Sequence, residues 1–503
     1  MLQCVENRIL RRVSMGALSE HIQSIERNIR MGNGQAAREE LLPLLPKAVP
    51  DGFLAKLANF CWRLDLPDRG LRILRRSVYP PQRAPEPPDP VVLAEYAQCL
   101  IKLGAVYEAE ELLAQIPENA TPLKFAYRAS AAMSRWDYER AYPYMVKYSA
   151  CLSPSSYPAY VARINLAATA ICIGKYQSAT ILLRELLNDA SSKRFYRLYG
   201  TALNLAAQAC IARKKWKEVD VYLDAATRTL KNIGPIDVLY IRKWQAIKTL
   251  AVRGKLEPLR QVRIEATAIN LWETVRQCDE YEALLSQNRA LLLHLYYGTP
   301  YPHWRERLLK EFGSDIEIPM EYPWAFGGAR AGALRIDALI RRQMTGSDQI
   351  PLRLLRVLVL DFYRPQRIPE IFAKLYPGEK FNLSVKARVY EALTRLRAWL
   401  RTEGIPLIID GKDGWFRLSS MVPCFVVVPR PDSILDQLTI RFETLLAVFG
   451  DKTFTLQEAA HILQVSSRTT NRILISGIER GLAKRDGHRR AARYRIERPK
   501  PSD

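Results

Sequence analysis

Basic side chains crowd the stretch SSRTTNRILISGIERGLAKRDGHRRAARYRI, which runs from Ser466 to Ile496 near the end of this 503-residue chain. Between Arg468 and Lys500 there are eleven Lys and Arg residues against three Asp and Glu, a surplus of eight positive charges. The chain as a whole has a formal net charge of +23. Because Arg and Lys donate to phosphate oxygens, polyanions are expected among its partners.

Two short helices are expected to position these bases. The sequence Thr455-Leu-Gln-Glu458 is a capping-box pattern, which predicts a helix from Thr455 to Gln464. Ser466 then caps a second helix, which ends at Gly481. Helical spacing turns one set of its residues inward and exposes another set at its N-terminus. The inward set is Thr470, Leu474, Gly477 and Ile478, and the exposed set is Ser467, Arg468, Thr469, Asn471 and Arg472.

The residues after Gly481 predict a β-hairpin. Two short strands, LAKRD and ARYRI, flank the turn signal Asp486-Gly487. Helix, turn, helix and hairpin together resemble the helix-turn-helix of many bacterial regulators, in which an Arg-rich wing follows a capped helix. The resemblance implies that the helix start reads bases and that the wing contacts phosphates or the minor groove. The wing residues would be Arg489, Arg490, Arg493 and Arg495. The alternative is a basic tail on a protein-binding winged helix.

An earlier segment shows the same order of elements. We expect helices at 334–342, 351–363, 367–377 and 384–401, and strands at 406–410 and 414–418. On the helix 384–401 an apolar stripe faces inward, and polar residues form the opposite stripe. The apolar stripe is Val385, Val389, Leu393, Leu396 and Leu400, and the polar stripe is Lys386, Tyr390, Thr394, Arg397 and Arg401.

This segment resembles the effector domain of bacterial response regulators of the OmpR/PhoB type. The likeness lies in VYEALTRLRAWL from Val389 and GWFRL from Gly414. It implies that 384–401 is the recognition helix and that Gly411–Gly414, with Lys412, is the tip of the wing. No receiver domain precedes it, so phosphorylation-driven activation is not implied.

Helical repeats are expected before these segments. Pairs of periodic helices recur between residues 17 and 297, and an aromatic residue follows the turn in each of four copies: Tyr107, Tyr138, Tyr176 and Trp216. The pattern resembles the tetratricopeptide repeat, which implies an α-solenoid with a groove for a protein or peptide.

The predicted fold is therefore mostly α, an α-solenoid followed by two winged helix-turn-helix domains with small β-wings. The expected boundaries are a tetratricopeptide-like α-solenoid at 1–297, a linker at 298–333, a first winged helix at 334–420, a linker at 421–436 and a second winged helix at 437–498.

Several other classes of function are disfavoured. The chain has no nucleotide-binding glycine motif, no HExxH and no GxSxG, and its five histidines lie far apart, so no enzyme, cofactor or metal site is expected. Eight scattered cysteines argue against a disulfide framework. No apolar run is long enough to span a membrane, which predicts a cytoplasmic protein without a membrane partner.

The expected function is that of a bacterial transcription regulator that binds double-stranded DNA. The solenoid would bind a protein or peptide, or mediate oligomerisation such as a homodimer. One alternative is a scaffold subunit, such as a PCI-domain protein, whose winged helix pairs with other proteins. RNA binding through the basic face is a further alternative, because phosphate contacts alone do not distinguish the two polymers.

Overall fold

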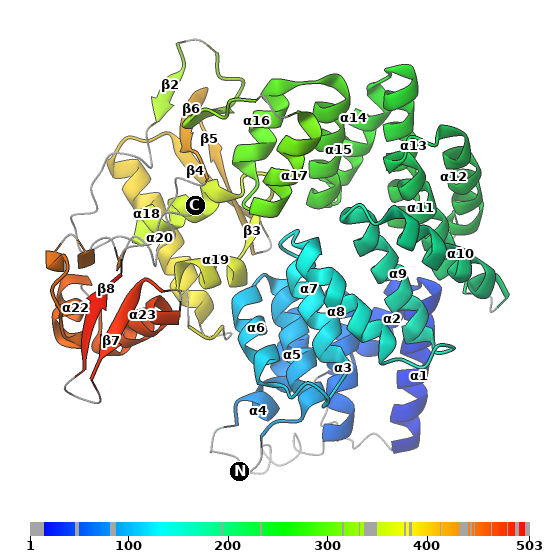
Figure 1. Cartoon of the computed structure of the whole chain (residues 1–503), viewed down its shortest axis with the longest axis horizontal. Coiled ribbons are helices and arrows are strands. Elements are labelled where there is room, and N and C mark those ends of the chain that lie inside the picture. The colour runs from blue at the N-terminus through cyan, green and yellow to red at the C-terminus, as the bar shows by residue number, and fades with distance from the viewer. Residues whose placement is uncertain are drawn as a thin grey trace, which may run out of the picture.

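The computed structural model shows a mostly helical chain, as expected, and the described residues of its C-terminal region form three small sheets (Figure 1). In the part of the chain that the structure describes, no helix combines the length and apolar character needed to cross a membrane. The structure describes the chain except for residues 1–14, 46–49, 81–86, 193–194, 232–233, 314–315, 331, 337–349, 377–378, 382–384, 413, 432–440, 443–444, 447, 464, 480, 488–491 and 498–503.

In the described residues up to 298, helices follow one another and most are joined by short turns. Each helix packs against the next, and alternate helices, such as α5 with α7 and α11 with α13, also contact each other. The bounds are α1 (Met15–Met31), α2 (Gly34–Leu41), α3 (Asp51–Arg63), α4 (Pro67–Val78), α5 (Pro90–Leu103), α6 (Val106–Gln115), α7 (Leu123–Met133), α8 (Tyr138–Ala150), α9 (Tyr157–Cys172), α10 (Tyr176–Ser192), α11 (Tyr196–Ala212), α12 (Trp216–Leu230), α13 (Pro235–Arg253), α14 (Glu257–Ala268), α15 (Trp272–Ser286) and α16 (Arg289–Gly298).

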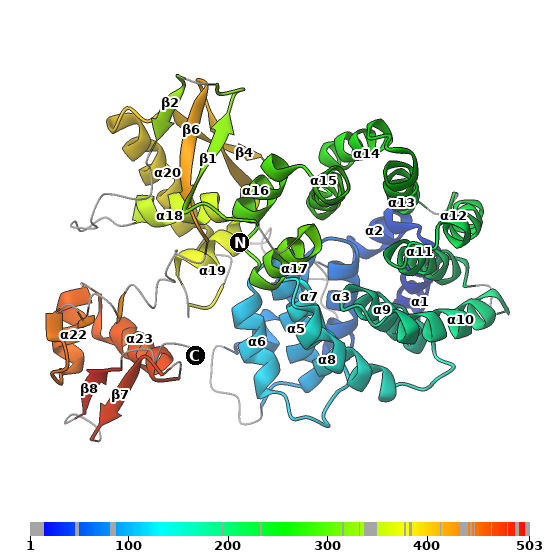
Figure 2. The same cartoon turned by 45° about the horizontal axis from the view of Figure 1, so that its top comes forward.

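These helices form a curved array that bends back on itself (Figures 1 and 2). The turn between α7 and α8 meets α15 and α17 (Pro302–Phe312). There the Trp136 indole N–H donates to the Glu273 carboxylate over 3.2 Å, and the Trp136 and Trp304 rings pack edge to face at 6.1 Å. The contact fixes the curvature of the array, because it joins elements more than 130 residues apart in the sequence.

Most turns between paired helices share one backbone form. One residue has positive φ, and the following amide donates to a carbonyl five residues back, as from Ala105 to Leu100 (3.0 Å) and from Lys215 to Cys210 (2.9 Å). This is the Schellman motif, in which glycine is usual. Here the positive-φ residue is a glycine in some turns and not in others. Examples are Gly104, Gly174, Asp65, Trp136, Lys214 and Asn270. The backbone turn therefore recurs even where the glycine of the repeat signature is absent.

Lys214 and Gly174 offer a matched test of this turn. Lys214 is exposed with φ of 56°, so Lys214→Gly removes backbone strain and should raise the free energy of unfolding by roughly 0.5–1 kcal/mol. Gly174 has φ of 75° and open space around its Cα, so Gly174→Ala should lower it by about 1 kcal/mol. Thermal unfolding midpoints of the two variants should move in opposite directions. A shared direction of shift would contradict the assigned turn.

The C-terminal region combines short helices with strands. Its elements are β1 (Glu321–Phe326), β2 (Leu334–Ile336), α18 (Ile350–Leu360), β3 (Gln366–Arg367), α19 (Ile368–Leu375), α20 (Lys386–Thr402), β4 (Leu407–Lys412), β5 (Trp415–Ser420), β6 (Cys424–Pro429), α22 (Leu456–Leu463), α23 (Ser467–Glu479), β7 (Ala483–Asp486) and β8 (Arg493–Ile496). The sheets have the strand orders β1-β6-β2, β3-β5-β4 and β7-β8.

The first of these sheets differs from the sequence prediction. The predicted helix at 334–342 is wrong at its start, because Leu334–Ile336 is a strand parallel to β6; residues 337–342 lie outside the described part. The expected linker 298–333 contains α17 and β1, and the expected linker 421–436 contains β6. The physical reason is the run CFVVVP of β6, whose buried backbone satisfies its hydrogen bonds by pairing with β1 on one side and β2 on the other.

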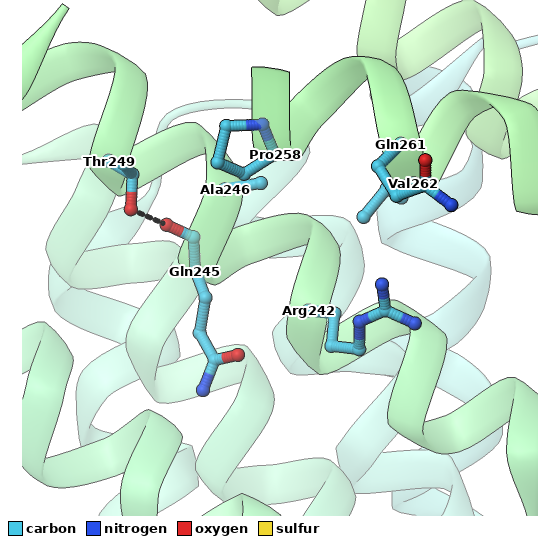
Figure 3. A pocket seen from close by; sticks show the side chains of 7 residues that line it. All are labelled: Arg242, Gln245, Ala246, Thr249, Pro258, Gln261 and Val262. Atoms are coloured by element: carbon cyan, nitrogen blue, oxygen red, sulfur yellow. Dashed lines mark hydrogen bonds between the residues drawn. The ribbon is translucent and has the colours of Figure 1, made fainter. Parts of the chain in front are cut away.

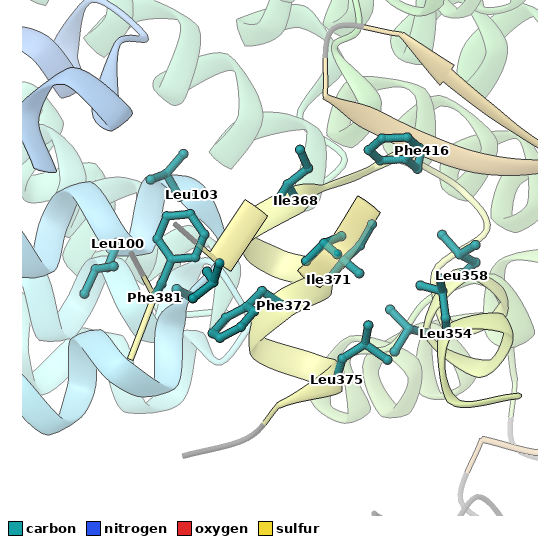
Figure 4. Close-up of a cluster of buried hydrophobic side chains, with 14 of the residues drawn as sticks. Leu100, Leu103, Leu354, Leu358, Ile368, Ile371, Phe372, Leu375, Phe381 and Phe416 are labelled. Atoms are coloured by element: carbon teal, nitrogen blue, oxygen red, sulfur yellow. The ribbon is translucent and has the colours of Figure 1, made fainter. Parts of the chain in front are cut away.

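One hydrophobic core joins the array to the C-terminal region. It runs from α4–α7 into α18, α19, α20 and the first two sheets. Figure 4 shows Leu100 and Leu103 of α5 beside Phe372 and Phe381. A separate core contains Phe442, Phe454 and Leu474 and holds α22, α23, β7 and β8 together. The last part of the chain is therefore an independent packing unit, whereas the part before it shares its core with the array.

Candidate nucleic-acid interface

Two segments of the C-terminal region repeat one topology. In the first unit (residues 350–420) the order is α18, β3, α19, α20, β4 and β5, with β3 pairing with β5. In the second unit (residues 441–497) helical residues 441–442, 445–446 and 448–449 are followed by Phe454, which bridges to Tyr494 of β8, and then by α22, α23, β7 and β8. Both units thus order their elements as helix, strand, two helices and a hairpin.

The two helices of the second unit are capped as predicted. The Thr455 N–H donates to the Glu458 carboxylate (2.6 Å), and the Glu458 N–H donates to the Thr455 hydroxyl (3.2 Å). The Thr455 N–H also holds the pKa of Glu458 below its ordinary value. Ser466 caps α23 by accepting from the Thr469 N–H at 3.2 Å. These caps fix where α23 begins, and therefore which residues occupy its first turn.

Helix α23 has one buried and one exposed face. Thr470, Leu474 and Gly477 are buried, and a side chain at Gly477 would meet the Phe442 ring at 2.0 Å, so only glycine fits there. Ile478 is half-buried. The exposed residues in the first two turns are the predicted ones: Ser467, Arg468, Thr469, Asn471 and Arg472. Two guanidinium groups, an amide and two hydroxyls therefore point away from the core at the start of one helix.

The β7–β8 hairpin adds further bases. Arg493 and Arg495 are exposed on β8, opposite Asp486 and Lys484 of β7. Glu497 pairs with Lys484 at 3.2 Å and with Arg495 at 3.5 Å. This carboxylate therefore partly neutralises the positive charge at the open end of the hairpin. The sequence did not single out Lys484 and Arg485, both of which are exposed on β7. Strand alternation would have placed only one of these neighbours on the exposed face. The predicted wing residues Arg489 and Arg490 lie outside the described residues.

The predicted stripe of the first unit lies on α20. Its apolar face, Val385, Val389, Leu393, Leu396 and Leu400, is buried as expected. On the other face Tyr390, Thr394 and Arg401 are exposed, and Lys386 is half-buried. Arg397 is half-buried because its guanidinium donates to the Ile409 carbonyl of β4 (3.1 Å). Lys412 is exposed at the end of β4. Arg397 thus links α20 to β4. The polar stripe of α20 is therefore less evenly exposed than the sequence predicted.

Helix α19 packs within the first unit and against the α5–α6 turn of the array. Six of its residues are buried: Ile368, Pro369, Glu370, Ile371, Phe372 and Leu375. A side chain at Gly104, in the α5–α6 turn, would come within 2.9 Å of the Glu370 Cβ, so glycine allows this close approach. At the start of α19 the Arg367 guanidinium lies 3.6 Å from the Asp65 carboxylate and donates to the Lys102 carbonyl at 3.5 Å.

The segment between α19 and α20 is also held by the array. The Phe381 N–H donates to the Glu108 carboxylate of α6 over 2.7 Å. The Lys380 ammonium lies over the Tyr79 ring, 4.3 Å from its centroid. Burial raises the pKa of Glu108 to about 7, and the Phe381 N–H and Lys380 oppose that rise. Glu108 therefore changes charge near neutral pH at the contact between α6 and the first unit.

This contact should depend on pH. The pKa of Glu108 is about 7 in the folded chain and about 4.5 in the unfolded chain. Between these two pH values the folded chain holds a proton that the unfolded chain has released, so the free energy of unfolding falls as pH rises to and through 7. Relative to Glu108→Gln, the wild type should lose on the order of 1 kcal/mol of unfolding free energy between pH 6 and pH 8. The groups that face Glu108 are Lys380, Glu111 and Tyr79. Thermal midpoints of both proteins at the two pH values test this, and parallel pH profiles would contradict it.

Other parts of the chain offer less chemistry. A pocket between α13 and α14 has its one cation, Arg242, already held by two hydrogen bonds to the Glu265 carboxylate (2.5 and 2.8 Å). Figure 3 shows the residues lining it: Arg242, Gln245, Ala246, Thr249, Pro258, Gln261 and Val262. Among the described residues, no group of three or more His, Cys, Asp and Glu side chains is placed to hold a metal ion.

Comparison with known proteins adds no assignment. No protein-family model matches the chain, and no curated protein matches it.

Proposed function

We propose that this protein is a transcription regulator that binds double-stranded DNA in a sequence-specific manner through its second unit. In this proposal the second unit is a winged helix, α23 is its recognition helix and the β7–β8 hairpin is its wing. The observation that carries the proposal is the exposure of Ser467, Arg468, Thr469, Asn471 and Arg472 on the first turns of α23, beside an exposed basic hairpin.

The chemistry of these side chains suits a duplex. The major groove admits an α-helix, and recognition helices contact base edges with their N-terminal residues. Arg forms paired hydrogen bonds with guanine, and Asn does so with adenine, so Arg468, Asn471 and Arg472 provide base-reading donors and acceptors. Arg493 and Arg495 of the hairpin would bind the flanking phosphates or minor groove.

We further propose roles for the remainder of the chain. The helical array would be a tetratricopeptide-like α-solenoid that binds a protein or peptide, or that mediates oligomerisation such as a homodimer. The first unit would be a winged helix similar to the effector domains of the OmpR/PhoB type. The protein would act in the bacterial cytoplasm, without a cofactor.

One observation favours a second candidate function, that of a scaffold subunit. The first unit is packed against α4–α6, so this chain already uses one such unit to contact protein. A scaffold would use the second unit in the same way and would bind no nucleic acid. The open face of α23 and its bases favour the regulator, because a protein-binding face is depleted of charge at its centre.

The test is a fluorescence-anisotropy titration of the full chain. Duplex selected from the genome of the host is compared with random duplex and with RNA, at about 50 and 200 mM salt. With roughly six to ten phosphate contacts, affinity should fall by about 10³ to 10⁵ between the two salt concentrations, while selected duplex stays preferred. Tighter binding of RNA, or no preference among duplexes, would overturn the proposal.

A further inference from the structure

We infer that the face of the first unit formed by α19 and the α19–α20 segment is a protein-binding surface, occupied by α4–α6 of the same chain, and that duplex contact falls to the second unit alone. This inference rests on the proposed function. It also reverses one sequence expectation, since both units were expected to bind DNA.

Docking on a duplex requires the helix before the recognition helix to be accessible. In helix-turn-helix proteins the recognition helix enters the major groove while the preceding helix crosses the phosphate backbone. In the first unit the preceding helix is α19, and most of its residues are buried between its own core and the array. In Figure 4 α19 and Phe381 lie against α5, with Leu100 and Leu103 facing them.

The donors that a DNA phosphate would need in this region are already occupied by the array. Two carboxylates of the array stand at this face: Asp65 beside Arg367, and Glu108 on the Phe381 N–H. Arg367 and that amide are donors of the kind that a phosphate would need, and the array already uses both. A phosphate in their place would also meet the negative charge of Asp65.

The second unit provides the comparison within the same molecule. Its corresponding helix, α22, has only Ala459 fully buried, and Gln457, Glu458 and His461 are exposed. The unit lies beside the first unit and apart from the array in both views (Figures 1 and 2). The helix before the proposed recognition helix is thus covered in the first unit and open in the second, and the array contacts it only in the first.

Charge-reversal pairs in the full chain test the inference. Arg468→Glu with Arg472→Glu changes the second unit, and Arg401→Glu with Lys412→Glu changes exposed bases of the first. Arg213→Glu with Lys217→Glu, on the exposed surface of the array, is a control with the same change in net charge. The second-unit pair should weaken binding to selected duplex at least 100-fold. The first-unit pair should match the array control, within about threefold of wild type. A larger loss from the first-unit pair than from the control overturns the inference.

A measurement without DNA separates this inference from the proposed function. If no variant and no wild type binds duplex, the proposed function fails, and the covered face is judged by hydrogen exchange at the Phe381 amide. That amide should exchange at least tenfold faster in Glu108→Ala than in wild type, because Glu108 is its acceptor. Fast exchange in the wild type, unchanged by the substitution, means that α6 does not occupy the face and overturns the inference.

Discussion

Replacing Arg468 and Arg472 together by alanine lowers affinity for the selected duplex by roughly 100-fold or more and leaves affinity for random duplex nearly unchanged. Both side chains are exposed on the first turns of α23, where recognition helices read base edges. Each lost base contact costs about 1–3 kcal/mol, and the loss applies only where the matching base is present. Anisotropy titration against both duplexes measures the difference.

The wing provides the matched comparison for this experiment. Arg489→Ala and Arg490→Ala should weaken binding to selected and random duplex alike and reduce the salt dependence, because phosphate contacts carry no sequence information. An equal loss on both duplexes from the Arg468 and Arg472 substitutions would show that these residues also contact only phosphates. The assignment of α23 as the reading helix would then be wrong.

Replacing Arg276 by alanine should have the largest effect on stability. Arg276, in α15, is fully buried and donates to the Asp361 carboxylate at 3.0 Å, next to the end of α18. Asp361 in turn accepts from Arg364 (2.8 Å), whose guanidinium also holds the Glu370 carboxylate at 2.6 Å. The array and the first unit are thus joined by buried charges. Removing one partner leaves others under-compensated in a low-dielectric interior, at a cost of about 3–5 kcal/mol.

Thermal unfolding and limited proteolysis measure this effect. The midpoint of Arg276→Ala should fall by roughly 3–6 °C, with early cleavage between α17 and α18. The control is Arg242→Ala, which removes an exposed pair with Glu265 on the same array and should cost less than about 1 kcal/mol. Similar midpoints for the two variants would show that the buried network contributes no more than a surface ion pair.

Much of the second unit could be predicted from the sequence, because its signals are local. The capping box at Thr455 and Glu458, the cap at Ser466 and the inward face of α23 each depend on residues a few positions apart. The strands β7 and β8 also lie where their sequences predicted them, although Asp486 pairs with Arg493, so residues 487–492 and not a two-residue turn connect them. Period and capping are properties of the chain within about one or two helical turns, so they can be read without the fold.

The sheet of β1, β6 and β2 could not be predicted in this way. Leu334–Ile336 is too short to show a period, and it becomes a strand only because β6 pairs with it about 90 residues later in the chain. The turns at Asp65, Trp136 and Lys214 were obscured for a different reason. There a non-glycine residue takes the positive φ that the repeat signature assigns to glycine, so the residue that would mark the turn in the sequence is absent.

The sequence by itself determined the helical character of the chain, the two similar C-terminal units and the faces of α20 and α23, since each follows from periodicity over short distances. Only the tertiary structure decided that these units differ in what they expose. Contacts such as Phe381 to Glu108 and Arg276 to Asp361 join residues 273 and 85 positions apart. No local pattern encodes such contacts, because they exist only once the array has folded back on the first unit and buried its charges against one shared core.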